Sequence, residues 1–213
     1  MAFVDVVVMA AGKGTRMKSS MPKVLHRLGG RALLQHVIDT AGQLQARKVV
    51  VITGHGAEQV EATLVHNDHV QCVRQMPQLG TGHAMQQAVP VLADDGITLV
   101  LSGDVPLTQA NTLNALMACV RQAGATSDSL ALLTLDMPNP TGYGRIVRSV
   151  QGDSVLAIVE QKDASPEQLK IQEVYSGIMA VPAKQLKTWL AKLDNQNAQG
   201  EYYLTDVVKW AVA

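Results

Sequence analysis

A glycine-rich loop that carries basic side chains is the first place where this sequence could do chemistry. The loop follows a short apolar run and consists of Ala10-Ala11-Gly12-Lys13-Gly14-Thr15-Arg16-Met17. Gly12 and Gly14 allow a ligand to approach the backbone amides closely. Lys13, Arg16 and, further on, Lys23 can neutralise phosphate charge. The spacing therefore predicts a polyphosphate site; the alternative is a tight turn whose charged side chains are only solvated.

Two commoner glycine motifs do not fit this loop. The dinucleotide-binding fingerprint requires a further glycine where Met17 stands and a helix that begins at once, whereas Pro22 delays the helix. The spacing that a P-loop requires before its Gly-Lys-Ser/Thr triplet is also absent. We therefore disfavour a dinucleotide-dependent oxidoreductase.

Polar residues also follow two later apolar runs. Asp104 can hold Mg²⁺ together with substrate phosphates, and it serves equally well as a turn or helix-cap residue. Gln75 and Gln78 carry amide groups that can match the edge of a pyrimidine base. Gly80 and Thr81 open the next helix, so the alternative for this segment is a polar loop with a helix cap.

A glycine and a carboxylate in the second part of the chain suit an acylated sugar. Glu160 can accept hydrogen bonds from two sugar hydroxyls, and the Gly144 amide can donate to an acyl carbonyl. Their plain alternatives are a loop glycine and a surface acid at a strand end.

These groups need a scaffold that brings them together. Apolar runs alternate with segments of helical periodicity, and the runs cover residues 4–9, 48–52, 70–74, 97–101 and 129–135. This alternation predicts an α/β fold with a Rossmann-like, doubly wound, mostly parallel sheet, in which ligands bind beyond the carboxyl ends of the strands. The later segments predict a hairpin over 145–160, a strand at 177–181 and helices at 183–193 and 205–212.

Composition excludes several classes of protein. With 213 residues, 47% hydrophobic and 17% charged, the chain can bury the core of one α/β domain and is not generally disordered. Its apolar runs are far shorter than the about 20 residues of a membrane span, and its N-terminus lacks a secretory pattern, so we expect a cytoplasmic protein. The net charge is zero, yet residues 1–50 carry eight basic and two acidic side chains. This local field suits a small polyanion better than nucleic acid.

The motifs, taken in order, carry a resemblance to a known family. The glycine-rich loop followed by Pro22-Lys23 resembles the signature loop of the sugar-1-phosphate nucleotidylyltransferases. Together with it, further segments resemble the N-terminal uridylyltransferase domains of the bifunctional GlmU family, and these segments are Gln75–Ala84, Gly103–Leu107, Pro140–Ile146, Glu160–Asp163 and Gly200–Asp206. The resemblance covers nearly the whole chain.

The resemblance implies the nucleotide-diphospho-sugar transferase fold as a single domain over 1–213, with a nucleotide-binding part at 1–136 and a small sugar-binding lid region at 137–213. It implies magnesium-dependent transfer of a uridylyl group from UTP to N-acetyl-α-D-glucosamine 1-phosphate, a step in supplying peptidoglycan and lipopolysaccharide synthesis. The transfer is an in-line attack that releases pyrophosphate and needs no protein nucleophile. Alternatives are a nucleotidylyltransferase of this fold that uses another base or sugar, and a nucleotide-binding fragment without turnover.

Residue by residue, the resemblance assigns roles to the candidates. It makes Arg16 and Lys23 catalytic, and it makes Asp104 both the Mg²⁺ ligand and a neighbour of the ribose. The implied nucleotide-binding residues are Ala10, Ala11, Gly12, Lys13, Gly14, Gln75, Gln78, Gly80, Thr81 and Asp104. The implied sugar-binding residues are Gly144, Glu160 and Tyr175.

The sequence departs from the family pattern in three places, the first being Ser102, which stands where the family often has a tyrosine before Gly-Asp. At the second, Tyr175 replaces the asparagine with which the family commonly contacts the sugar. The asparagine that completes the family's magnesium site falls beyond Ala213, as does the left-handed β-helix acetyltransferase domain. We therefore expect that domain, and the trimerisation that it drives, to be absent here.

Overall fold

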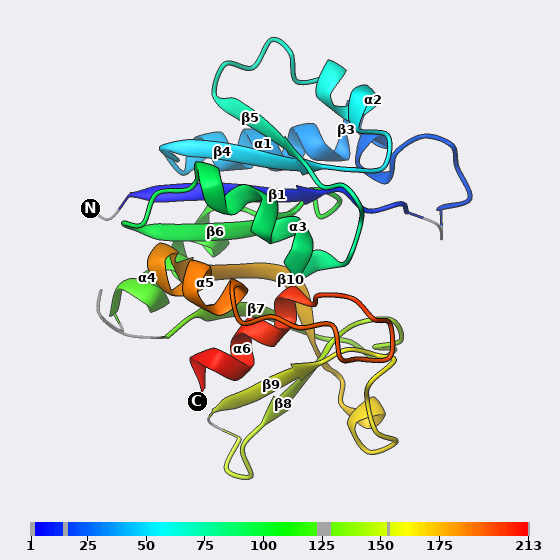
Figure 1. The fold of residues 1–213 in the computed structure, drawn as a ribbon, viewed down its shortest axis with the longest axis vertical. Helices are drawn as coiled ribbons and strands as arrows, with labels where there is room; N and C mark the ends of the chain where they lie inside the picture. The colour runs from blue at the N-terminus through cyan, green and yellow to red at the C-terminus, as the bar shows by residue number, and fades with distance from the viewer. Residues whose placement is uncertain (1–2, 15–16, 123–128, 153, 213) are drawn as a thin grey trace.

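Apolar runs rich in valine form a central sheet with helices on both faces (Figure 1). The computed structural model describes residues 3–14, 17–122, 129–152 and 154–212. Within them, eight strands make up the sheet: β1 (Val4–Ala10), β4 (Lys48–Thr53), β5 (Val70–Arg74), β6 (Ile97–Ser102), β7 (Ala131–Asp136), β8 (Arg145–Arg148), β9 (Val155–Val159) and β10 (Glu173–Pro182). Their order is β5-β4-β1-β6-β10-β8-β9, with β7 paired to β10 outside this path. A separate ribbon pairs β2 (Arg27–Leu28) with β3 (Arg31–Ala32).

The parallel half of the sheet positions the glycine-rich loop and the loops beside it. β1 pairs in parallel with β4 and with β6, and β4 pairs in parallel with β5. Val6, Val7 and Val8 are fully buried because helices cover both faces of β1. The loops that follow these strands therefore meet at one edge of the sheet, where open α/β folds bind ligands.

Amphipathic helices make the two outer layers. The first layer contains α1 (Leu33–Gln43) and α4 (Ala110–Gln122), and the second contains α3 (Thr81–Ala88), α5 (Ala183–Leu190) and α6 (Val207–Ala211). A shorter helix, α2 (Ala57–Ala62), follows β4. This arrangement confirms the predicted α/β class. In the described part of the chain, no helix combines the length and apolar character needed to cross a bilayer.

The second part of the chain adds antiparallel strands, and here the structure corrects the predicted boundaries. β10 is antiparallel to β6, β7 and β8, while β8 and β9 form the predicted hairpin. β10 begins at Glu173 rather than at Gly177. Its pairing with β7 shifts register between Tyr175 and Ile178, and this irregularity hides the first residues of the strand from an alternating sequence pattern. The predicted helix at 205–212 begins only at Val207, after a single 3₁₀ turn.

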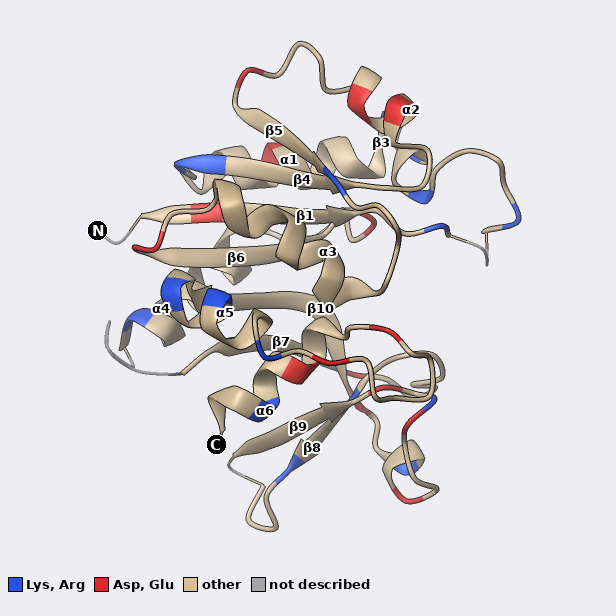
Figure 2. Ribbon diagram, in the orientation of Figure 1, with Lys and Arg blue, Asp and Glu red and all other residues tan. Residues whose placement is uncertain are grey.

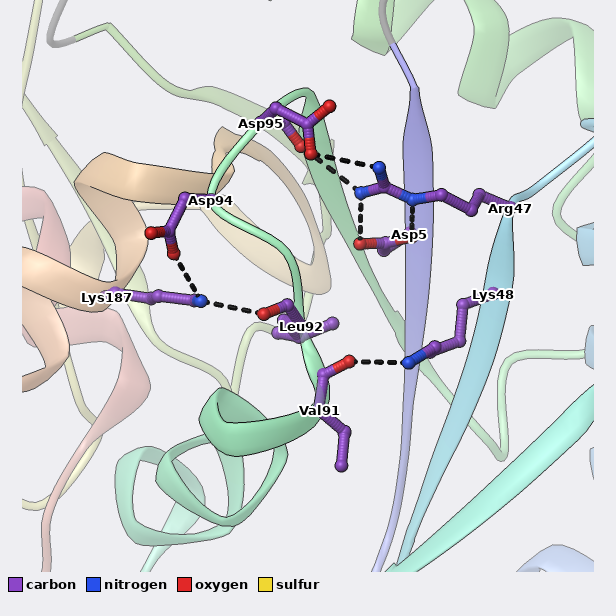
Figure 3. A network of polar contacts seen from close by, with 8 residues as sticks. All are labelled: Asp5, Arg47, Lys48, Val91, Leu92, Asp94, Asp95 and Lys187. Carbon is purple, nitrogen blue, oxygen red and sulfur yellow. Dashed lines mark hydrogen bonds and ion pairs between the residues drawn. The ribbon is translucent and has the colours of Figure 1, made fainter.

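Polar contacts hold the loop before β6 at the amino ends of the strands (Figure 3). The Arg47 guanidinium donates to the two carboxylate oxygens of Asp5 at 2.9 and 2.8 Å and to Asp95 Oδ1 at 2.9 Å. Lys48 and Lys187 each donate to a backbone carbonyl of this loop at 2.7 Å. This network lies at the edge of the sheet opposite to the candidate loops, so it supports the scaffold rather than the site.

Candidate active site

A cavity of about 440 Å³ lies at the carboxyl ends of the parallel strands. Nine of the residues that the sequence predicts for the site line it, namely Ala10, Ala11, Gly12, Lys13, Gln75, Gln78, Gly80, Thr81 and Asp104. The structure therefore brings together residues from three loops that are far apart in the sequence. The loop after β1 carries basic residues, whereas the segments near the end of β9 and before α6 carry acidic residues together with a few lysines (Figure 2).

The glycine-rich loop packs directly against Lys23. Gly14 has a φ of 59°, and a Cβ at this position would lie 2.8 Å from the Cβ of Lys23. Only glycine combines this left-handed conformation with such close packing at low cost. Arg16, which was predicted to be catalytic, lies outside the described residues, so its role stays a prediction.

Two glutamine side chains join the loop after β5 to its neighbours. Gln75 is almost fully buried, and its Nε2 donates to the Gly80 carbonyl at 2.9 Å. Gln78 Nε2 donates to the Ala11 carbonyl, also at 2.9 Å. Gly54, which follows β4, was missed by the sequence analysis, yet a Cβ there would lie 2.6 Å from Gln78 Nε2. A glycine directly after a parallel strand was the available signal.

A late segment of the chain completes this side of the cavity. The backbone carbonyl of Tyr202 accepts a hydrogen bond from the Gly82 amide at 2.7 Å, and the Tyr202 amide donates to the Leu79 carbonyl at 2.8 Å. Glu201, its neighbour, lines the cavity. The Gly200–Asp206 motif contributed to the resemblance, but no residue of it was assigned to the site, because nothing local indicates that it pairs with the loop after β5.

Asp104 lies at the end of β6 between a cation and a hydroxyl group. Lys23 Nζ forms an ion pair with its Oδ2, and Ser102 Oγ donates to its Oδ1 at 2.6 Å. Burial raises the pKa of Asp104, but the hydrogen bonds from Lys23 and Ser102 outweigh this effect and leave the pKa below its ordinary value. An ionised carboxylate that already attracts a cation, next to a hydroxyl oxygen, fits the hard oxygen ligands that Mg²⁺ prefers.

The three predicted sugar-binding residues lie next to one another, although none of them lines the cavity. A Cβ at Gly144 would lie 3.5 Å from Glu160 Oε1, and the Tyr175 amide donates to the Gly144 carbonyl at 2.9 Å. The Tyr175 hydroxyl is buried and has no hydrogen-bond partner in the described part of the chain. Burial, and then the nearby Glu160, raise the pKa of this phenol.

Glu160 is held by Thr205, which the sequence analysis did not assign. Thr205 Oγ1 donates to Glu160 Oε1 at 2.9 Å. Burial raises the pKa of Glu160, and the neighbouring acids Asp206, Asp163 and Glu201 raise it further, against the opposing effect of the Thr205 hydrogen bond. The preceding amide, that of Leu204, donates to Thr81 Oγ1 at 2.9 Å. Two consecutive residues thus connect the cavity to the Gly144 and Glu160 region.

The fold and the site together define a nucleotidyltransferase. The model of the MobA-like NTP transferase domain matches residues 6–196, and the chain belongs to this family. Over its length the sequence is similar to bifunctional GlmU proteins, with 68% identity over 215 residues to the protein from Albidiferax ferrireducens and 65% over 217 residues to that from Polaromonas naphthalenivorans. Each match covers 98% of this chain and 45% of the relative, so the chain spans about half the length of these relatives. These matches confirm the resemblance that the motifs predict.

Solved structures of low sequence identity share the fold. UDP-glucose pyrophosphorylase complexed with UDP-glucose superposes with a TM-score of 0.79 at 15% identity, covering 99% of this chain and 87% of that one. UDP-glucose pyrophosphorylase from Acinetobacter baumanii gives a TM-score of 0.70 at 20% identity, covering 98% and 82%. At these identities the likeness shows the fold alone.

Proposed function

We propose that this nucleotidyltransferase transfers a uridylyl group from UTP to N-acetyl-α-D-glucosamine 1-phosphate, releasing pyrophosphate and forming UDP-N-acetylglucosamine. The observation that carries the proposal is a cavity that joins a basic glycine loop, a glutamine-bearing loop and the Asp104 carboxylate, with Gly144 and Glu160 connected to it. The similarity to bifunctional GlmU over 98% of the chain supports the choice of base and sugar. In this proposal residues 1–136 bind the nucleotide and residues 137–213 bind the sugar, within a single domain.

On the nucleotide side, the amides of the glycine loop and Lys13 bind the triphosphate, and the segment from Gln75 to Thr81 recognises uracil. The burial of Gln75 and its bond to the Gly80 carbonyl support this role, because a fixed carboxamide can discriminate the donor and acceptor pattern of a base. Gln78 ties this segment to Ala11 and keeps the base site and the phosphate site in register.

In this proposal the protein accelerates the transfer mainly by stabilising the charge that develops on the phosphates. The phosphate of the sugar attacks the α-phosphorus in line, and Arg16 and Lys23 neutralise the charge that moves onto the leaving pyrophosphate. Nucleotidyltransferases of this kind generally use a divalent metal, and Asp104, with the Ser102 hydroxyl beside it, would hold Mg²⁺ here. When bound, the ion neutralises and orients the phosphates. No protein nucleophile is required.

On the sugar side, the Glu160 carboxylate accepts hydrogen bonds from ring hydroxyls and the Gly144 amide donates to the acyl carbonyl. Tyr175 supports this side through its amide, which donates to the Gly144 carbonyl at 2.9 Å, and it stands where the family has an asparagine.

The test is pyrophosphate release by this chain with Mg²⁺, N-acetylglucosamine 1-phosphate and each of the four nucleoside triphosphates in turn. Release with UTP alone supports the proposal. Release with another nucleotide instead favours a different nucleotidylyltransferase of this fold. Calorimetric binding of UTP without any release, together with activity in a longer chain, identifies a nucleotide-binding fragment.

A further inference from the structure

Arg145 is a fully buried cation without an acidic partner in the described part of the chain. It begins β8, directly after Gly144, and is 2% exposed. Its guanidinium donates to the Tyr143 carbonyl and to Gln161 Oε1, the latter at 2.8 Å, while its Nε has no partner among the described residues. Burying a guanidinium against neutral acceptors alone is costly, so this arrangement needs a reason beyond packing.

These contacts hold the turn that presents Gly144. Gln161 Oε1 accepts from the Gly142 amide at 3.0 Å as well as from Arg145, so one side-chain oxygen fixes two points of the turn. Arg145 also holds the Tyr143 carbonyl. The Gly144 carbonyl is occupied by the Tyr175 amide, whereas no hydrogen bond within the described residues uses the Gly144 N–H.

We propose that Arg145, acting with Gln161, is a positioning residue that aims the Gly144 N–H at the acyl group of the sugar and so sets the preference for an N-acetylhexosamine. This inference rests on the proposed function of Gly144. A guanidinium suits the task because its planar fork fixes direction as well as distance at two acceptors. Gly144 packs closely on β9, since an added Cβ would lie 2.8 Å from Ile158 Cγ2. The turn therefore has little room in which to reorient the Gly144 N–H.

The experiment compares the calorimetric Kd of UDP-N-acetylglucosamine with that of UDP-glucose, which differ in the acetamido group. Gln161→Met removes the shared acceptor and keeps the side-chain length, Gln161→Glu restores an acceptor, and Arg148→Met is the control. Arg148 lies on the same strand but bonds to Glu173 at 2.6 and 2.7 Å. We expect Gln161→Met to lower the preference for the acetylated ligand by about tenfold, the size of one lost hydrogen bond, at unchanged UDP-glucose affinity. Gln161→Glu and Arg148→Met should keep the preference.

The outcomes separate the inference from the proposed function. Suppose that the unmodified chain prefers the acetylated ligand. If Gln161→Met keeps that preference, or weakens the affinity for both ligands by the same factor, the positioning role is overturned while the proposed function stands. If the unmodified chain binds neither ligand, or binds both equally, the proposed sugar assignment fails and the inference falls with it. Should circular dichroism show that Gln161→Met does not fold, Arg145→Lys, which keeps the charge but loses the fork, takes its place with the same expected loss.

Discussion

Replacing Arg47 by methionine should destabilise the fold and leave the candidate site intact. The Asp5 carboxylate is 2% exposed and receives two hydrogen bonds from Arg47, at 2.9 and 2.8 Å (Figure 3). Methionine retains much of the apolar stem but removes both donors. The variant therefore leaves a carboxylate inside the protein, at the start of the central strand, without its cation.

The magnitude follows from how deeply each charge is buried. Breaking a buried ion pair by removing one partner costs about 3–5 kcal/mol, and the lower end applies because the Arg47 side chain is 30% exposed. The second pair, to Asp95, adds little, since that carboxylate is 60% exposed and exposed pairs contribute about 0–1 kcal/mol. A loss of about 3 kcal/mol corresponds to a Tm lower by about 6–12 °C in a chain of this size.

Urea unfolding and calorimetry measure the effect, with Asp95→Asn as the control that should cost less than about 1 kcal/mol. The double variant Arg47→Met with Asp5→Val should recover most of the loss, because an apolar side chain in this strand no longer needs a cation. A free energy of unfolding of Arg47→Met within about 1 kcal/mol of the unmodified chain would refute the reasoning. So would a double variant no more stable than the single one.

Three further predictions concern the site. Because burial raises the pKa of Glu160 in the folded state, the protein loses stability as pH rises from 4.5 through that pKa. Glu160→Gln should therefore raise Tm at pH 7 and leave Tm unchanged below pH 4.5. An equal rise in Tm at both pH values would contradict this. Lys23→Ala should lower kcat by at least about 100-fold, and unchanged turnover would remove Lys23 from the chemistry. Asp104→Asn should weaken Mn²⁺ binding measured by electron paramagnetic resonance, whereas unchanged affinity would place the metal elsewhere.

Local pattern was sufficient for much of this protein. The valine run of β1, the glycines and cations that follow it, and the alternation of strands with helices predict an α/β sheet with a phosphate loop at its edge. These features depend on residues close in sequence, since burial on both faces and left-handed turns leave a periodic or compositional trace. The same is true of Asp104 and Gln75, because each lies within two residues of the end of a strand whose place in a parallel sheet determines where it lies.

The contacts that join the cavity to the Gly144 and Glu160 region have no local signature in the sequence. Thr81 accepts from Leu204 across 123 residues of sequence, and Glu160 accepts from Thr205 across 45. The reversal of β10 and the burial of Arg145 likewise depend on which strands become neighbours. Sequence alone indicated most of the strands, the glycine-rich loop with its basic residues, and the chemical types present. Only the tertiary structure decided which polar groups are partnered, because a hydrogen bond between distant segments exists only after the strand order has brought them together.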